Sequence, residues 1–84
     1  MESKPLFPGS WIVVGAEEPV DAVVSSIRPK RVEVVYLDLH NRAMHREAKW
    51  KGTHWAFEDA TSPAKPADKD ARLEPYVKML RSKT

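Results

Sequence analysis

Apolar and polar residues alternate along the middle of the chain in two runs that are rich in β-branched side chains. The runs span Ala22 to Ile27 and Arg31 to Leu37, and the basic sequence Arg-Pro-Lys-Arg joins them. A period of two is typical of strands, and a short polar connection between two such runs is typical of a hairpin. The chain from Val20 to Asn41 therefore predicts a β-hairpin that is closed by a polar turn at Asp38 to Asn41.

The second run of this hairpin carries apolar residues on both of its faces. Because successive side chains of a strand point to opposite sides, one face holds Val32, Val34 and Tyr36. The other face holds Val35 and Leu37 beside a glutamate. A strand that is apolar on both sides is expected at the centre of a fold, where other elements cover both faces.

Residues 43–50 allow two interpretations. Their Ala, Met, Arg, Glu and Lys favour a helix, whereas alternation places Met44, Ala48 and Trp50 on one face of a strand. The Lys-Gly-Thr-His sequence that follows is typical of a tight turn into a further short strand, Trp55 to Phe57. We favour the strand, because the second short strand would pair back onto it.

The chain divides into four parts. Residues 1–10 form an N-terminal arm, 11–58 form the folded body, and 59–71 have no apolar anchor and are expected to form a flexible loop or linker. Residues 72–84 are expected to hold a short helix, with proline in its first turn and basic residues at its end. Its apolar residues recur at helical spacing, at Leu73, Tyr76, Val77 and Leu80. We expect this segment to dock on the open end of the folded body; the alternative is a short partner-binding peptide.

The composition narrows the classes of function. A chain of 84 residues has one modest core and little room for a large catalytic cleft. The absence of cysteine excludes disulfides, thiolate nucleophiles and cysteine zinc sites. The net charge is only +2, and its excess falls in residues 61–84. No apolar run is long enough to cross a membrane or to form a signal peptide, so we expect a cytoplasmic protein without a membrane partner.

Five short strands and a late loop predict a mainly β fold, a small five-stranded antiparallel SH3-like barrel with a short C-terminal helix. Within that class, residues 9–57 resemble the Tudor family. The resemblance lies in a β-branched second strand, Asp21 to Ile27, a third strand of alternating valines, Arg31 to Leu37, and the Asp-Leu-His-Asn turn after it. It implies a barrel that binds a ligand and does not catalyse a reaction.

The aromatic cage of methyl-reading Tudor domains is not matched. Such a cage surrounds a methylated lysine or arginine with several rings, whose π-faces attract the cation. Leu39 stands at the position of the family's turn tyrosine, and Glu17 and Glu18 stand where a further ring is expected. Only Tyr36 remains near the expected cage, so reading of methylated residues is not the function we expect.

The leading hypothesis is an interaction module that binds a peptide or protein surface. Its candidate ligand-binding residues are the rings Tyr36 and Trp55 and, in the turn before the last strand, His54 and Lys51. We expect Trp50 and Phe57 in the core, because a small barrel needs a few large rings to fill it.

The alternative is nucleic-acid binding by the same barrel. Between positions 39 and 57 one acid, Glu47, accompanies a group of basic residues that are interleaved with tryptophans. Single-stranded nucleic-acid sites combine such charges with stacking rings. The residues of this candidate site are Arg42, His45, Lys49 and Lys51, together with the basic tail. A solvated strand face is the simpler interpretation of the same pattern.

Metal and catalytic chemistry find little support. His40, His45 and Glu47 are the best metal candidates, but their spacing matches no paired ligand motif. No nucleophile elbow or glycine-rich phosphate loop is present in the sequence. The prediction is a protein without enzymatic activity, cofactor or resident metal.

Overall fold

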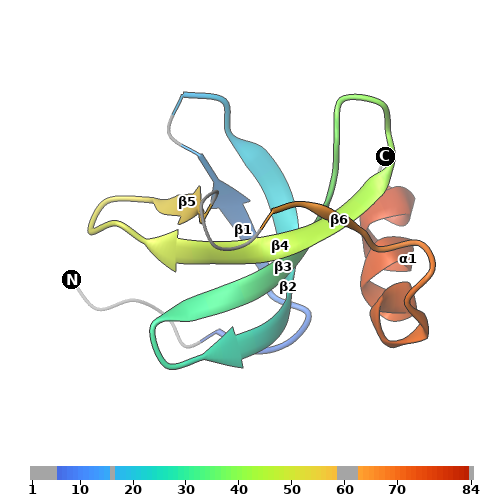
Figure 1. The fold of residues 1–84 in the computed structure, drawn as a ribbon, viewed down its shortest axis with the longest axis horizontal. Coiled ribbons are helices and arrows are strands. Elements are labelled where there is room, and N and C mark those ends of the chain that lie inside the picture. The colour runs from blue at the N-terminus through green and yellow to red at the C-terminus, as the bar shows by residue number, and fades with distance from the viewer. Residues whose placement is uncertain (1–5, 16, 59–62, 84) are drawn as a thin grey trace.

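Five strands close into a small barrel in the computed structural model, which describes residues 6–15, 17–58 and 63–83 (Figure 1). The strands are β1 (Trp11–Val14), β2 (Val20–Arg28), β3 (Arg31–Leu37), β4 (Ala43–Trp50) and β5 (Trp55–Phe57). The two-residue strand β6 (Lys65–Pro66), the 3-10 turn η1 (Ala71–Leu73) and the helix α1 (Glu74–Lys83) follow. The mainly β barrel with a short C-terminal helix is confirmed, and its architecture is compatible with an SH3-like fold.

Neighbouring strands of the barrel pair antiparallel except where it closes. β1 and β5 lie parallel, with Val14 opposite Trp55, and the amide of Gly15 donates to the Trp55 carbonyl at 2.7 Å. The reason is geometric: five strands that reverse direction one after another begin and end in the same direction. The expectation of a purely antiparallel barrel is corrected at this one pair.

The two apolar faces predicted for β3 are both covered. One core cluster fills the barrel interior, where the side chains of Val32, Val34 and Tyr36 pack. A second cluster lies outside the barrel, where Val23 of β2 and Val35 of β3 are fully buried under the C-terminal segment. The strand assignment for residues 43–50 is also confirmed, because β4 pairs with β3 along seven positions.

The C-terminal segment docks on the barrel wall. Its buried residues pack against the outer faces of β2 and β3, and they are Leu73, Val77 and Leu80. The prediction that the segment docks is therefore confirmed. The predicted docking place, the open end of the barrel, is wrong. Residues 59–62 of the expected flexible loop lie outside the described residues. In the rest of this predicted loop, β6 pairs with the start of β4 and Ala67 is fully buried.

Candidate functional site

Trp50 lies at the surface, at the end of the barrel that carries the β2–β3 hairpin. It is 49% exposed, so its expected place in the core is wrong. The physical reason is its register: the last pair between β3 and β4 joins Arg31 to Lys49, and Trp50 stands one position beyond the end of β3. Nothing of β3 reaches far enough to cover the indole ring.

Trp55 fixes the position of the Trp50 ring. The two residues are opposite one another in the β4–β5 pair, and their rings meet edge to face with centroids 5.4 Å apart. Trp55 itself is partly buried, packs against the barrel core and is held between β4 and β1. The pair therefore combines one anchored ring with one ring that is available to a partner.

The turn between β4 and β5 brings three of the predicted ligand residues together. The amide of Lys51 donates to the carbonyl of His54 at 2.8 Å, and His54 leads directly into Trp55. The His54 ring contacts the Thr53 hydroxyl through Nδ1 at 2.9 Å and is half-buried, whereas Lys51 is exposed. Whether these side chains bind a ligand stays a prediction.

Tyr36 lies apart from these three residues, inside the barrel. Its side chain is 7% exposed and packs against Phe57, with ring centroids 4.9 Å apart. The guanidinium of Arg46 lies over the Phe57 ring, 4.5 Å from its centroid. This cation–π contact explains how the apolar side of β4 accommodates a positive charge. Tyr36 therefore contributes to the interior and presents little ring surface to a ligand.

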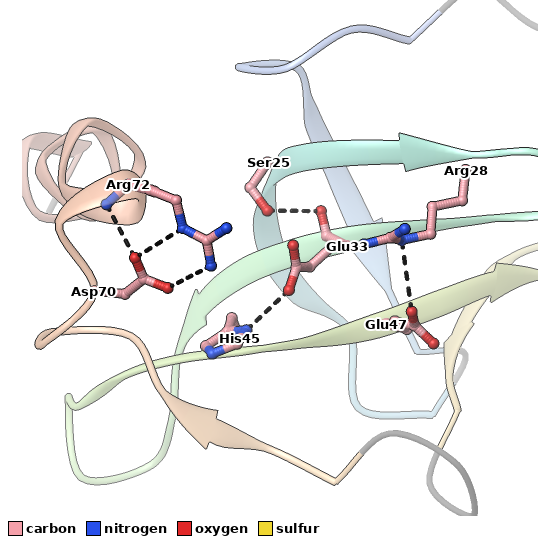
Figure 2. A network of polar contacts seen from close by, with 7 residues as sticks. All are labelled: Ser25, Arg28, Glu33, His45, Glu47, Asp70 and Arg72. Atoms are coloured by element: carbon pink, nitrogen blue, oxygen red, sulfur yellow. Dashed lines mark hydrogen bonds and ion pairs between the residues drawn. The ribbon is translucent and has the colours of Figure 1, made fainter.

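Basic residues of β2, β3 and β4 form a rim at the Trp50 end of the barrel. Arg28 is opposite Arg31 in the pair next to the β2–β3 turn, and Arg31 is opposite Lys49, so cations occupy adjacent positions on three neighbouring strands. Both arginines reach toward Glu47, at 3.8 Å and 3.6 Å, with about half of each side chain exposed; Figure 2 shows the Arg28 contact. Lys30 in the hairpin turn is exposed as well.

Ile27 adds an apolar residue to this rim. It is opposite Val32, whose side chain points into the barrel, and residues opposite one another in a pair point to the same side. Ile27 thus faces the open end below the barrel core and is 45% exposed. We call this combined region the hairpin-end surface, and it consists of Ile27, Arg28, Lys30, Arg31, Lys49, Trp50, Lys51, His54 and Trp55.

The residues of the nucleic-acid alternative do not form one surface. Arg42 lies in the β3–β4 turn, where its Nε donates to Asp38 at 3.1 Å, and His45 contacts Glu33 through Nδ1 at 3.0 Å (Figure 2). Lys49 and Lys51 lie at the far end of β4 and belong to the hairpin-end surface. In Figure 1 the helix α1, which carries the described basic residues of the tail, lies on the opposite side of the molecule from the β4–β5 turn.

His45 and Glu33 lie on the side of the barrel that faces Asp70 and Arg72 (Figure 2). Ser25 donates its hydroxyl to the Glu33 carbonyl at 3.1 Å, and Asp70 pairs with Arg72 at 3.1 Å on the facing segment (Figure 2). Among the described residues, no three histidine, aspartate or glutamate side chains converge as metal ligands. The contacts of Ser25 and His45 with Glu33 join strands of the barrel, and the Asp70–Arg72 pair lies within its own segment.

Asp38 organises the turn that carries Arg42. Its carboxylate accepts hydrogen bonds from the backbone amides of His40 and Arg42, at 2.8 Å and 2.9 Å, and Asn41 adopts a positive φ of 65°. The hydrogen bond from the Arg42 amide is the main cause that lowers the pKa of Asp38 below its ordinary value of 3.8. The hydrogen bonds to this carboxylate therefore stabilise the turn more when Asp38 is ionised than when it is protonated.

This pKa shift predicts a pH dependence of stability. A carboxyl group with a lowered pKa stabilises the fold above its ordinary pKa, and the stability is lost as the pH falls through the lowered value. We expect D38N to melt at a lower temperature than the wild type near neutral pH and the two melting temperatures to converge below pH 3.8. Thermal melts between neutral and strongly acidic pH measure this difference; a difference that stays constant would contradict the assignment.

Comparison with protein-family models, with curated protein sequences and with solved structures finds no match to this chain. Within the described residues, no helix has the length and apolar character needed to span a membrane. The assignment of a function consequently depends on the surface itself.

Sequence patterns missed part of the hairpin-end surface. Arg28 and Arg31 are visible as a basic turn, but only the strand register places Arg31 beside Lys49. The expectation of a core position for Trp50 follows from the need of a small barrel for large rings, and the position of Trp50 as the last residue before a turn is the one signal that indicates exposure.

Proposed function

We propose that this protein is a non-enzymatic interaction module that binds a peptide segment or protein surface at the hairpin-end surface. The observation that supports the proposal is the Trp50–Trp55 pair, in which an indole ring that is half exposed is held by a partly buried one. Tryptophan is enriched among the residues that contribute most to binding energy at protein interfaces.

The scaffold favours binding at this surface. β4 is paired with β3 and β5 up to Lys49 and Trp50, so the backbone that presents the indole ring is fixed. A ring with two rotatable bonds on a fixed backbone loses little conformational entropy when a partner covers it. The exposed side chain of Ile27 extends the apolar area beside charged residues, as in an interface with an apolar centre and a polar rim.

The resemblance to the Tudor family supports a binding barrel but not the recognition of methylated residues. Leu39, at the position of the family's turn tyrosine, is fully exposed, and Tyr36 is buried. A cage of several rings therefore has no counterpart around that turn in the described residues. The proposed site lies instead at the opposite end of β4.

The proposal is tested by selection from a displayed library of random peptides on the immobilised full chain. We expect enriched peptides that bind the chain in solution, measured by calorimetry, and that quench or shift its tryptophan fluorescence. Enrichment of no peptide, or binding that leaves the tryptophan emission unchanged, would overturn the proposal.

A further inference from the structure

We infer that the partner of the hairpin-end surface is an acidic peptide segment that carries an apolar side chain for the Trp50 ring. This inference rests on the proposed function and adds the chemical class of the partner. It follows from the charges at the barrel end that carries the exposed indole ring, where Arg31 and Lys49 lie on the outer face of the sheet and Trp50 lies on the inner face.

Cations outnumber carboxylates at the hairpin-end surface. Arg31 and Lys49 are directly opposite one another, and Glu47 is the acid that both arginines of the hairpin approach. The cations of the surface are Arg28, Lys30, Arg31, Lys49 and Lys51, and all of them are exposed. Like charges on opposite positions of a pair are unfavourable. In the free protein one carboxylate, that of Glu47, approaches both Arg28 and Arg31, so a partner that places further carboxylates beside Arg31 and Lys49 adds attraction there.

A row of glutamates limits where an acidic partner can lie. Glu33 is opposite Glu47 on the outer wall of the barrel, and the amide of Glu58 donates to the Glu47 carbonyl at 3.0 Å. This row lies one step further from the barrel end than Arg31 and Lys49. Although Glu47 is shared with two arginines and Glu33 contacts His45, the row disfavours a negatively charged chain further along the outer wall. The attraction is therefore strongest beside Arg31 and Lys49, at the end that carries Trp50.

This confinement favours a short acidic peptide over a nucleic acid. A nucleic-acid strand carries a charge at every phosphate and binds along extended basic grooves. The cations of the hairpin-end surface occupy one end of the barrel, and Arg42 and His45 further along the molecule are engaged by Asp38 and Glu33. A peptide with a few carboxylates around one apolar residue matches both the size and the sign of the surface.

Three matched peptides test the inference: Glu-Glu-Phe-Glu-Glu, the same peptide with glutamine for every glutamate, and the same peptide with lysine. We expect the acidic peptide to bind at least about tenfold more tightly than the glutamine peptide at low salt, with the difference shrinking at high salt because the charges are exposed. R31E is expected to abolish this preference. K69E, which makes the same charge change at an exposed lysine in the segment before η1, is expected to retain it.

The outcomes separate the inference from the proposed function. Equal binding of the acidic, glutamine and lysine peptides would overturn the acidic partner while supporting a peptide-binding surface. Binding of none of these peptides, together with no enrichment from the random library, would overturn both. Tighter binding of a single-stranded oligonucleotide than of any peptide, lost in R31E, would assign the surface to nucleic acid and overturn the inference.

Discussion

W50A is expected to weaken the binding of a library-selected peptide by at least about tenfold while leaving the barrel folded. Truncation of a central aromatic residue in an interface commonly costs about 2 kcal/mol or more, which exceeds a factor of ten in affinity. The fold should survive because the Trp50 ring is 49% exposed and lies beyond the last β3–β4 pair. Its edge-to-face contact with Trp55 is worth about 0.5–1.5 kcal/mol beyond the area that it buries.

The matched control is W11A. Trp11 is also partly exposed, at 39%, but it lies on β1 opposite Val23, on the outer face of the sheet, and does not belong to the hairpin-end surface. Calorimetry should give the W11A variant wild-type affinity, and thermal melts should show that both variants are folded. An equal loss of affinity in W11A and W50A would place the binding surface elsewhere on the barrel.

L80A is expected to lower the free energy of unfolding by about 2–5 kcal/mol, the range for removing a buried leucine side chain from a packed core. Leu80 is 4% exposed and belongs to the cluster in which α1 covers Val23 and Val35. The loss is large for a domain of this size, whose total stability is about 5–15 kcal/mol. Urea unfolding followed by circular dichroism measures it.

The control for L80A makes the same chemical change at the surface. Leu39 is fully exposed at the tip of the β3–β4 turn, so L39A should change the free energy of unfolding by no more than about 0.5 kcal/mol. If L80A were as mild as L39A, the C-terminal segment would contribute nothing to the stability of the barrel, and its docked position would be contradicted.

The strands of the barrel were predictable because their signal is local. Alternation and β-branching define β2 and β3, and the apolar residues on both faces of β3 correctly indicated that two layers cover it. The helical spacing of Leu73, Val77 and Leu80 likewise predicted a docked helix, although periodicity does not indicate which surface receives it.

The candidate site was less predictable because exposure depends on the ends of strands. Trp50 and Tyr36 both occupy positions that point into the barrel, and only the length of β3 decides that one is exposed and the other buried. The parallel closure of β1 on β5 and the short strand β6 depend on contacts between distant segments, which local patterns do not contain.

Binding at the hairpin-end surface is measured most directly by the indole N–H signals of the three tryptophans in a spectrum of the nitrogen-labelled chain. On titration with a library-selected peptide, we expect the Trp50 and Trp55 signals to shift together with the backbone amides of Arg31 and Lys49, and the Trp11 signal to stay in place. Shifts centred on Trp11, with Trp50 and Trp55 unchanged at saturation, would contradict the assignment of the hairpin-end surface.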